Sequence, residues 1–503
     1  MSPIVLKKVI QNTQMISSVF VPTGAQWKSL EAVPLQVRES GPKMLLFQHL
    51  ITWITAAEQL ICLQSYLIQD TAIIDALVTA SERGVQVYVM DSAEARLGGN
   101  GLEEEEHHST KDYRTMINTK FRYALVHRQA SNFHAKFILI DPSSPAPKGA
   151  LLTGNFNKKP FEENPELAVE LNKGQIEELF QVFVYHFWEY AQHEQTAKEE
   201  FEALKPAQQF ERPPLKQILL TSPDQPLSNL QATLLAQVEK AKHSIFFSTF
   251  GFDIDNAVSK AILAQLEAGV QVLVFCRPRE KAMHRNIDVL AAKGALVYCH
   301  PLIHAKSMVI DAQWGAVFSA NFEKHGMEQG LEAGVVLSSA QKDDLLKVYH
   351  NWQQTFPYQF KKEIPIAKLP HQYAQLRKGR LQSFIVQSEE NLKPVKKTVV
   401  HLKELIAYVE KKPIVKNTKA QKIIQEQTIG FKSIGDLTYS KQQTMVEGVD
   451  LVEYQETIKS KKEEKIVTHQ VLLFGASIAA LNLETTIEQL KKMDLENYKI
   501  FMK

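Results

Sequence analysis

The chain has 503 residues, a formal net charge of +2 and 44% hydrophobic residues. This length predicts two to four domains, and the composition is that of an ordinary globular protein. The small net charge excludes a protein that holds nucleic acid by bulk positive charge alone.

Cysteine content and hydropathy indicate the cellular compartment in which the protein is expected. Cys62, Cys276 and Cys299 form no CxxC pair or zinc-like cluster, so we expect free thiols in a reducing compartment. The N-terminus is too polar for a secretory signal, and no run approaches the roughly 18 apolar residues of a membrane span. The sequence therefore favours a cytoplasmic protein and disfavours a membrane partner.

Two stretches of the chain repeat one order of elements. Residues 56–90 and 240–275 each read as an apolar strand, an amphipathic helix and a strand that begins Gly-Val-Gln-Val. Gly84 and Gly269 stand where each helix is expected to end. Apolar strands with little alternation are typical of parallel strands buried on both faces. We therefore expect an α/β fold of two similar lobes, each a mixed, mostly parallel sheet flanked by helices.

Composition divides the remaining chain. Residues 98–114 are polar, contain four consecutive glutamates and are expected to form a loop. Lysine-rich segments near the C-terminus are either a solvated face or a surface for nucleic acid, a partner protein or another copy of the chain. The predicted domains are an N-terminal extension over 1–40, a first lobe over 41–205, a second lobe over 215–365 and an α+β accessory domain over 371–503.

A second repeat carries the chemistry. One copy reads HAKFILID, then LLTGNFN and NPELAVEL, and the other reads HAKSMVID, then AVFSANFE and GLEAGVVL. On a strand, residues two apart share a face, so each histidine would lie beside the lysine that follows it. Two nitrogenous groups on one face repel when both are charged, and a bound anion relieves that cost. The pattern predicts a phosphate site assembled from two halves.

The polar residues after each His-x-Lys complete the two half-sites. Asp141 and Asp311 close the apolar runs and could cap a turn or pair with a base. Asn157 and Asn321 offer amide donors to a phosphoryl oxygen. A downstream glutamate that holds the Nδ1 proton of a histidine leaves Nε2 free to attack or to donate. The candidate glutamates are Glu166 and Glu332.

Over residues of about 40 to 370, the sequence resembles the phospholipase D superfamily, whose mark is a duplicated HxKx4Dx6GSxN. The resemblance implies two lobes about a pseudo-twofold axis, a phosphohistidine intermediate, and no metal or cofactor. One histidine would attack phosphorus and the other would protonate the leaving oxygen; family habit favours His134 as the nucleophile. The implied catalytic residues are His134, Lys136, Asn157, Glu166, His304, Lys306, Asn321 and Glu332, supported by Asp141, Asn155, Asp311 and Ser319.

Both copies depart from the family motif. In the first copy the Gly-Ser pair reads Gly154-Asn155, which replaces a hydroxyl by an amide, and the preceding gap is longer. In the second copy Ser319 is kept, but Phe318 takes the place of glycine and would either narrow the site or pack beneath it. Histidine, lysine, asparagine and glutamate are retained in both copies, so we expect activity.

The sequence is compatible with three functions. The motif continuations, together with the expected location, favour a metal-independent nuclease that cleaves DNA or RNA, with defence against foreign nucleic acid as one setting. Seven basic residues near expected strand ends would line the strand path: Arg122, Arg128, Lys158, Lys159, Arg277, Arg279 and Lys324. The alternatives are a phospholipid hydrolase or phosphatidyl transferase, and a degenerate scaffold that recruits a partner through residues 371–503.

Overall fold

The computed structural model resolves the chain into two compact units, Thr23–Phe360 and Met1–Pro22 with Lys361–Lys503. The structure describes residues 4–7, 15–93, 119–122, 124–195, 201–205, 210–365, 368–370, 372–387, 398–401, 445–446, 449–459, 464–474 and 499–502. The expected loop at 98–114 lies outside the described residues.

The first lobe of the larger unit is a sheet with strand order β11-β10-β6-β5-β4-β7-β8-β9-β3. Its edge strand β3 falls within the segment expected as an N-terminal extension. The strands are β3 (Val37–Glu39), β4 (Leu60–Gln64), β5 (Gln86–Ser92), β6 (Val126–Ala130), β7 (Phe137–Ile140), β8 (Lys148–Leu152), β9 (Leu167–Glu170), β10 (His193–Gln195) and β11 (Phe201–Ala203). The helices are α1 (Leu45–Ala56), α2 (Thr71–Glu82), α5 (Lys158–Glu162) and α6 (Lys173–Tyr185), the last continuing as a π turn over His186–Tyr190.

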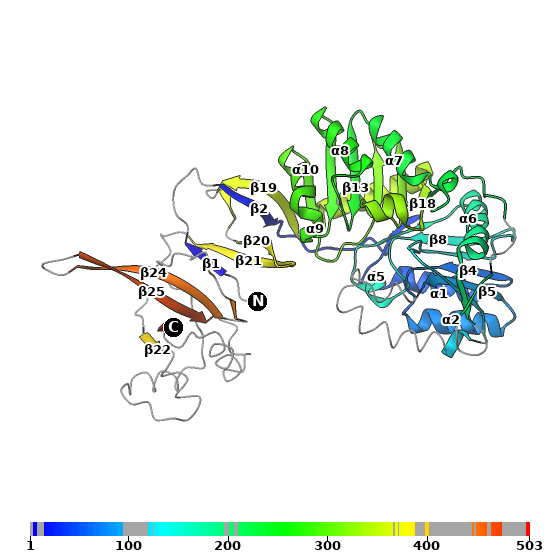
Figure 1. Cartoon of the computed structure of the whole chain (residues 1–503), viewed down its shortest axis with the longest axis horizontal. Helices are drawn as coiled ribbons and strands as arrows, with labels where there is room; N and C mark the ends of the chain where they lie inside the picture. Colours follow the sequence, from blue (N-terminus) through cyan, green and yellow to red (C-terminus); the bar gives the residue numbers. More distant parts are fainter. Residues whose placement is uncertain are drawn as a thin grey trace, which may run out of the picture. The chain divides into compact units, whose positions relative to one another are not determined.

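The second lobe repeats this order as β19-β15-β14-β13-β16-β17-β18-β12, with α7 and α8 side by side against it (Figure 1). Its strands are β12 (Ile218–Thr221), β13 (Ser244–Thr249), β14 (Gln271–Cys276), β15 (Leu296–Cys299), β16 (Ser307–Ile310), β17 (Trp314–Phe318), β18 (Glu332–Val336) and β19 (Tyr358–Pro365). The helices are α7 (Leu230–Glu239), α8 (Ala257–Glu267), α9 (Glu280–Ala282), α10 (Asp288–Ala292) and α11 (Ser339–Thr355). Single helical turns cover Gln225–Leu227, Met283–Ile287 and His325–Gln329.

Both sheets are mixed and flanked by helices, which confirms the two-lobed α/β fold. Parallel pairing is confined to β4, β5 and β6 in the first lobe and to β13, β14 and β15 in the second. The hairpins β7–β8 and β16–β17 are antiparallel, because a short turn rather than a crossover joins their strands. Parallel pairing is therefore less extensive than the apolar strand pattern predicted.

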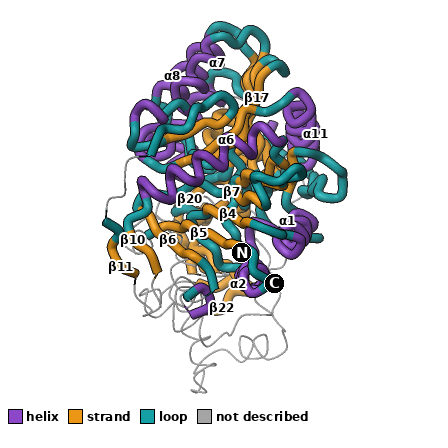
Figure 2. Tube along the Cα trace, turned by 90° about the vertical axis from the view of Figure 1, so that its right-hand side faces the viewer, coloured by secondary structure: helices purple, strands orange, loops and turns teal. Residues whose placement is uncertain are grey.

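The lobes meet along α6 and α11. Figure 2 shows α6 between the two lobes, and it contacts β4 and β8 of its own lobe as well as β12 of the other. Gln175 at the start of α6 and Gln341 at the start of α11 each donate Nε2–H to the other's Oε1 at 3.0 Å. Both glutamines hold the same place in a capping box. This reciprocal pair marks an approximate twofold axis between the lobes.

The smaller unit is built from strands in its described parts. One group pairs β1 (Ile4–Lys7), β21 (Arg380–Gln387), β20 (Gln372–Arg377) and β2 (Met15–Pro22), around a small core of Val19, Tyr373 and Phe384. A five-stranded sheet has the order β22-β26-β25-β24-β23, with β22 (Thr398–His401), β23 (Met445–Val446), β24 (Val449–Lys459), β25 (Glu464–Phe474) and β26 (Lys499–Met502). The helices expected within 371–503 fall outside the described residues.

A buried carboxyl in β3 gives the larger unit a pH-dependent stability. Glu39 accepts hydrogen bonds from the indole Nε1 atoms of Trp27 and Trp352, at 2.8 and 2.6 Å. Burial raises its pKa from 4.5 to about 7, against these bonds and the one from the Leu30 amide. The folded state therefore binds a proton more tightly than the unfolded chain. The stabilisation is complete below pH 4.5 and is lost as pH rises through 7.

We expect the free energy of unfolding to fall between pH 5 and pH 7.5, at about 1.4 kcal/mol per unit of pKa shift at most. In Glu39→Gln, which stays neutral, this fall should shrink, whereas Glu58→Gln at an exposed position should keep it. Urea unfolding followed by tryptophan fluorescence measures the slope. Equal slopes in Glu39→Gln and the unmodified protein would show that Glu39 does not titrate in this window.

Candidate active site

The two His-Ala-Lys segments lie just before β7 and β16 and are fixed by the opposite lobe. The amides of His134 and Ala135 both donate to the carbonyl of Leu331, at 2.9 Å. The amides of His304 and Ala305 both donate to the carbonyl of Pro165, at 3.2 and 3.3 Å. Each motif therefore rests on the loop that precedes the glutamate of the other lobe.

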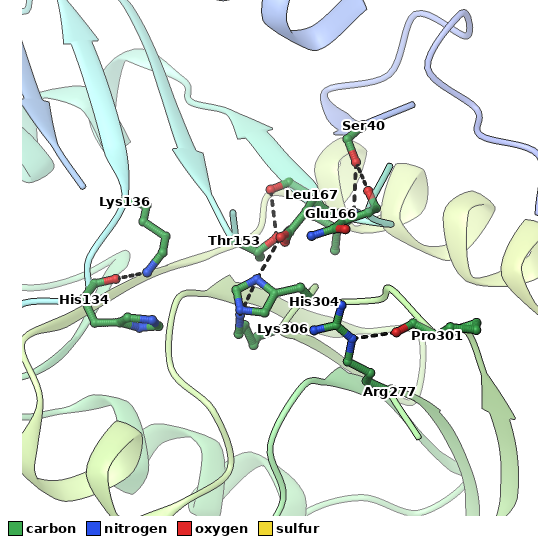
Figure 3. Close-up of polar contacts among 11 residues, drawn as sticks. Ser40, His134, Lys136, Thr153, Glu166, Leu167, Arg277, Pro301, His304 and Lys306 are labelled. Atoms are coloured by element: carbon green, nitrogen blue, oxygen red, sulfur yellow. Dashed lines mark hydrogen bonds and ion pairs between the residues drawn. The ribbon is translucent and has the colours of Figure 1, made fainter. Parts of the chain in front are cut away.

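Each glutamate pairs with the histidine of the opposite lobe. His134 Nδ1 lies 2.9 Å from Glu332 Oε2, and His304 Nδ1 lies 2.7 Å from Glu166 Oε1. Figure 3 shows the rings of His134 and His304 in one cluster with Lys306. The two histidine side chains are 17% and 18% exposed, whereas both glutamates are buried. One site thus contains a histidine from each lobe, and each ring is held by the partner lobe's carboxylate.

A hydroxyl orients each carboxylate. Thr153 donates to Glu166 Oε2 and Ser319 donates to Glu332 Oε2, both at 2.5 Å. Each hydroxyl also accepts the amide that follows its glutamate, Leu167 or Ala333. Thr153 and Ser319 are therefore equivalent residues. Thr153 was not among the site residues predicted from the sequence.

This equivalence corrects the asparagine register of the first lobe. The Phe156 amide donates to Leu67 O and the Phe322 amide donates to Gly251 O, so these phenylalanines correspond. Asn155 is then the counterpart of Asn321, and each has a buried Oδ1 without a hydrogen-bond partner among the described residues. Asn157, paired with Asn321 in the sequence analysis, instead begins α5 and donates to Gln69 Oε1 at 3.3 Å.

The predicted register was wrong because Gly154-Asn155 was aligned with the Gly-Ser pair of the family motif. The longer loop after Asp141 concealed the two-residue shift between the lobes. The shared strings Gly-Asn-Phe and Ala-Asn-Phe were the signal that could have prevented this error. Gly154 leaves room for the carboxylate, since a Cβ there would lie 2.8 Å from Glu166 Oε1. Phe318 is fully buried and packs against Gly334 and Phe322. It therefore packs beneath the site and does not narrow it.

The two lysines are fully buried beside the histidines. Lys136 Nζ donates to the carbonyl of His134 at 2.5 Å, and Lys306 Nζ lies 2.9 Å from both ring nitrogens of His304. Both ammonium groups act across the lobe boundary, since Lys306 lowers the pKa of His134 and Lys136 lowers that of His304. Buried positive charge of this kind is stabilised by a bound anion.

Burial sets the protonation of the site. It lowers the pKa of His134 to about 4 and that of His304 to about 3, against the raising effect of the paired carboxylates. Although burial alone would raise the pKa of Glu332, His134 and Lys136 hold it at about 2. At neutral pH both rings are neutral, Nδ1–H donates to an ionised glutamate, and Nε2 carries the lone pair.

Two aromatic rings that the sequence analysis missed complete the cluster. Tyr66 meets the His134 ring edge-on at 5.4 Å, and Phe250 meets the His304 ring at 4.7 Å. Tyr66 and Phe250 follow β4 and β13 at equivalent places, after Gln-Ser and Ser-Thr. The signal was present as an aromatic residue two positions after the end of β4 and directly after the end of β13.

The two aspartates of the motifs are structural. Asp141 accepts the amides of residues 58, 59 and 60, and Asp311 accepts those of 242, 243 and 244, all at 2.7 to 2.9 Å. Both aspartates have positive φ, 47° and 51°. They cap the turns at the far ends of β7 and β16 rather than pairing with a base.

The seven basic residues predicted to line the path of a nucleic-acid strand do not share one environment in the structure. Arg277 and Arg279 lie by Phe250, with Cζ 5.2 and 4.0 Å from its ring centroid. Arg128 is buried, pairs with Glu194 and covers the rings of Phe187 and Trp188, so it serves packing. Lys158 pairs with Glu162 on the surface.

The part of the chain that the structure describes contains neither a metal-ligand cluster nor a helix able to span a membrane. Within this part, no three His, Cys, Asp or Glu side chains are grouped so as to hold a metal ion. Nor does any helix in it combine the length and apolar character needed to cross a membrane.

Two like lobes that share one site, each supplying a His-Lys pair and a carboxylate for the other's histidine, define the class of this protein. Residues 50–189 and 234–357 match the family model described as "Cardiolipin synthase, PLD-like domain". These segments cover just over half of the chain, so the protein belongs to the phospholipase D-like family. Membership supports a phosphodiesterase-type enzyme. No curated protein matches the chain.

Solved structures show distant similarity. Polyphosphate kinase from Porphyromonas gingivalis is 15% identical, with 61% of this chain and 48% of that chain covered and a TM-score of 0.41. The chain thus spans about half of that kinase. Phosphatidylserine synthase from Haemophilus influenzae is 11% identical (70% and 91% covered, TM-score 0.47). The phospholipase D family member Nuc from Salmonella typhimurium is 21% identical (31% and 95% covered, TM-score 0.25).

Proposed function

We propose that this protein is a metal-independent phosphodiesterase that acts through a phosphohistidine, and that its substrate is DNA or RNA. The observation that carries the proposal is the exchange of carboxylates, which leaves a lone pair on Nε2 of both His134 and His304. Two such nitrogens with two buried ammonium groups provide a nucleophile, a proton carrier and charge stabilisation for one phosphoryl group.

In the proposed reaction, His134 Nε2 attacks phosphorus and the bond to the leaving oxygen breaks. When the phosphodiester anion binds, Nε2 of His304 takes up a proton from solvent, and Glu166 and the bound phosphate stabilise the imidazolium. The leaving oxygen then takes this proton from His304. Lys136 and Lys306 hold the non-bridging oxygens as negative charge grows. Water then attacks the phosphohistidine, gives its proton to His304, and releases His134 with a phosphate monoester as the second product.

Nucleic acid is favoured over lipid by the groups around the histidines. Tyr66 and Phe250 are partly exposed rings at the site, and aromatic rings beside cationic groups suit bases and phosphates of a single strand. We extend the proposal to a cytoplasmic setting, including defence against foreign nucleic acid, and to a partner or self-association role for residues 371–503. The second candidate, phospholipid hydrolysis or phosphatidyl transfer, is favoured by the description of the matching family model.

A substrate panel separates the candidates. Single- and double-stranded DNA, RNA and liposomes of phosphatidylcholine, phosphatidylglycerol and cardiolipin are incubated with the full chain in EDTA. We expect cleavage of a nucleic acid, and binding that weakens steeply with added salt. Release of lipid head groups without nucleic-acid cleavage would support the second candidate. No turnover of any substrate, with no trapped phosphohistidine, would leave only a scaffold.

The pH dependence of turnover follows from Lys306. Burial lowers its pKa from 10.5 to about 8, and Arg277 and Arg279 add to this against the two glutamates. Because the charged form holds the phosphoryl oxygen, kcat/KM should fall as pH rises through about 8. At the acidic end it should fall below about pH 4, where His134 takes up a proton.

Lys306→Arg tests this assignment, because arginine stays charged at all accessible pH values. The variant should be slower but should lose the decline above pH 8, whereas Lys324→Arg at an exposed position should keep it. Initial rates at substrate concentrations below KM, from pH 3.5 to 10, provide the profile. A decline near pH 8 that persists in Lys306→Arg would assign it to another group.

A further inference from the structure

Among the described residues, two arginines, Arg277 and Arg279, stand next to the site on its second-lobe side. They lie in the segment between β14 and α9, and the Arg279 amide donates to Arg277 O at 2.9 Å. Arg277 Nε also donates to the carbonyl of Pro301 at 2.6 Å, which ties it to the loop leading to His304. Figure 3 shows Arg277 beside His304 and Lys306. These bonds hold the backbone of the segment and the side chain of Arg277 in place.

Phe250 connects the arginines to the reacting groups. Arg279 Cζ lies 4.0 Å from its ring centroid, and the centroid of the His304 ring lies 4.7 Å from the same point. Lys306 Nζ is 5.6 Å from it. The distance between the Arg279 guanidinium and the His304 ring is therefore at most the sum of these two distances. Phosphates recur about every 3.4 Å along the axis of one nucleic-acid strand, so a neighbouring phosphate falls in this span.

The first lobe has no counterpart to Arg277. The repeated Gly-Val-Gln-Val aligns β5 with β14, and β5 pairs with β4 as β14 pairs with β13. In this alignment Arg277 corresponds to Ser92, which is fully buried. Within the described part of the chain, the approximately twofold site thus carries additional positive charge on its second-lobe side. A substrate with a single phosphate at the twofold axis gives no reason for this asymmetry.

The charges around the site favour an additional anion. Glu166 and Glu332 are already engaged by the histidines, and the nearby Glu323 pairs with Lys281 at 3.7 Å. No acidic side chain among the described residues forms an ion pair with Arg279. The field of both arginines reaches the buried ammonium, because each lowers the pKa of Lys306. A bound anion would offset this repulsion, and the planar guanidinium fork suits phosphate oxygens.

We propose that Arg277 and Arg279 bind a second phosphate of a nucleic-acid strand, next to the scissile phosphodiester and on the His304 side. This inference rests on the proposed nuclease function and adds a direction to it. With His134 as the nucleophile, the fragment that leaves toward His304 carries the second phosphate. The preferred substrate therefore has two adjacent phosphate groups rather than one isolated phosphodiester.

Three thymidine dinucleotides test the proposal: one without a terminal phosphate, one with a 5′-phosphate and one with a 3′-phosphate. The unmodified protein should prefer one of the phosphorylated forms over the bare dinucleotide by at least about tenfold in kcat/KM. Arg279→Gln should reduce this preference to about twofold or less, and Arg277→Gln should reduce it in part. Arg279→Lys, which keeps the charge but not the fork, should retain an intermediate preference.

Arg212→Gln is the matched control, because it removes an equal charge from a guanidinium that pairs with Asp224 instead. It should keep the full preference. Tryptophan fluorescence during urea unfolding checks that each variant is folded. Equal loss on all three dinucleotides in Arg279→Gln would place this arginine on the scissile phosphate, and an unchanged preference would remove it from substrate binding; either result overturns the proposal.

Failure of the wider function has a different signature. If the unmodified protein cleaves neither the dinucleotides nor longer strands, the nuclease proposal fails. If it cleaves all three dinucleotides at the same rate, the nuclease proposal stands and the second phosphate site is rejected.

Discussion

Replacing His134 with alanine is expected to lower phosphodiester cleavage by about 10³-fold or more. The reason is that Nε2 of this ring is the nucleophile in the proposed reaction, and no described neighbour carries an equivalent lone pair except His304. His304→Ala should also be severely impaired, because both proton transfers pass through that ring. His243→Ala, at an exposed position, is the control and should retain activity.

The two histidine variants should differ in what they accumulate. With a substrate labelled at the scissile phosphorus, His304→Ala should retain label on the protein, because its phosphohistidine is hydrolysed slowly. His134→Ala should retain none. The label should be lost in acid and resist alkali, as expected for a phosphorus–nitrogen bond. Trapping in His134→Ala but not in His304→Ala would reverse the two roles, and full activity in both variants would refute the mechanism.

Glu332→Gln is expected to cost about 10²- to 10⁴-fold in kcat, as large as the loss of an orienting carboxylate in a catalytic triad. A carboxylate can accept the Nδ1–H of His134 with either oxygen, whereas glutamine can accept it only with Oε1. If the amide NH2 group of glutamine faces Nδ1 instead, the hydrogen of the ring is placed on Nε2. The nucleophile would then be blocked without being removed. The control is Glu328→Gln, whose carboxylate accepts from Gln231 at 3.2 Å on the surface.

The exchange between lobes gives this prediction a second readout. Since Glu332 acts through His134, Glu332→Gln should add little to the defect of His134→Ala, about twofold or less. Combined with His304→Ala, it should add a further large loss. Glu166→Gln should show the opposite pattern, with its effect absorbed by His304→Ala. Double-variant kinetics on one substrate decide this, and a pattern that pairs each glutamate with the histidine of its own lobe would contradict the structure.

Local sequence determined the two-lobed organisation and most members of the site. The repeated strand–helix–strand pattern with Gly-Val-Gln-Val indicated two similar α/β lobes, because burial on both faces of a strand leaves a continuous apolar run. The duplicated His-Ala-Lys with a downstream glutamate indicated which side chains converge. The aspartates were recognised but not assigned, since capping three amides depends on where the chain turns back. The asparagine register of the first lobe was misjudged by two residues.

The tertiary structure decided which side chains face one another. Gln175 pairs with Gln341 across the twofold, and the same packing of the lobes places each glutamate beside the histidine of the opposite lobe. A strand pattern reports only which face of its own sheet a residue occupies, so pairing between two sheets stays undetermined until they pack. Thr153 joined the site for the same reason, because it reaches His304 through Glu166 only after the lobes close. Phe250 and Arg279 instead approach His304 within the second lobe, where β13 pairs with β14 and β16.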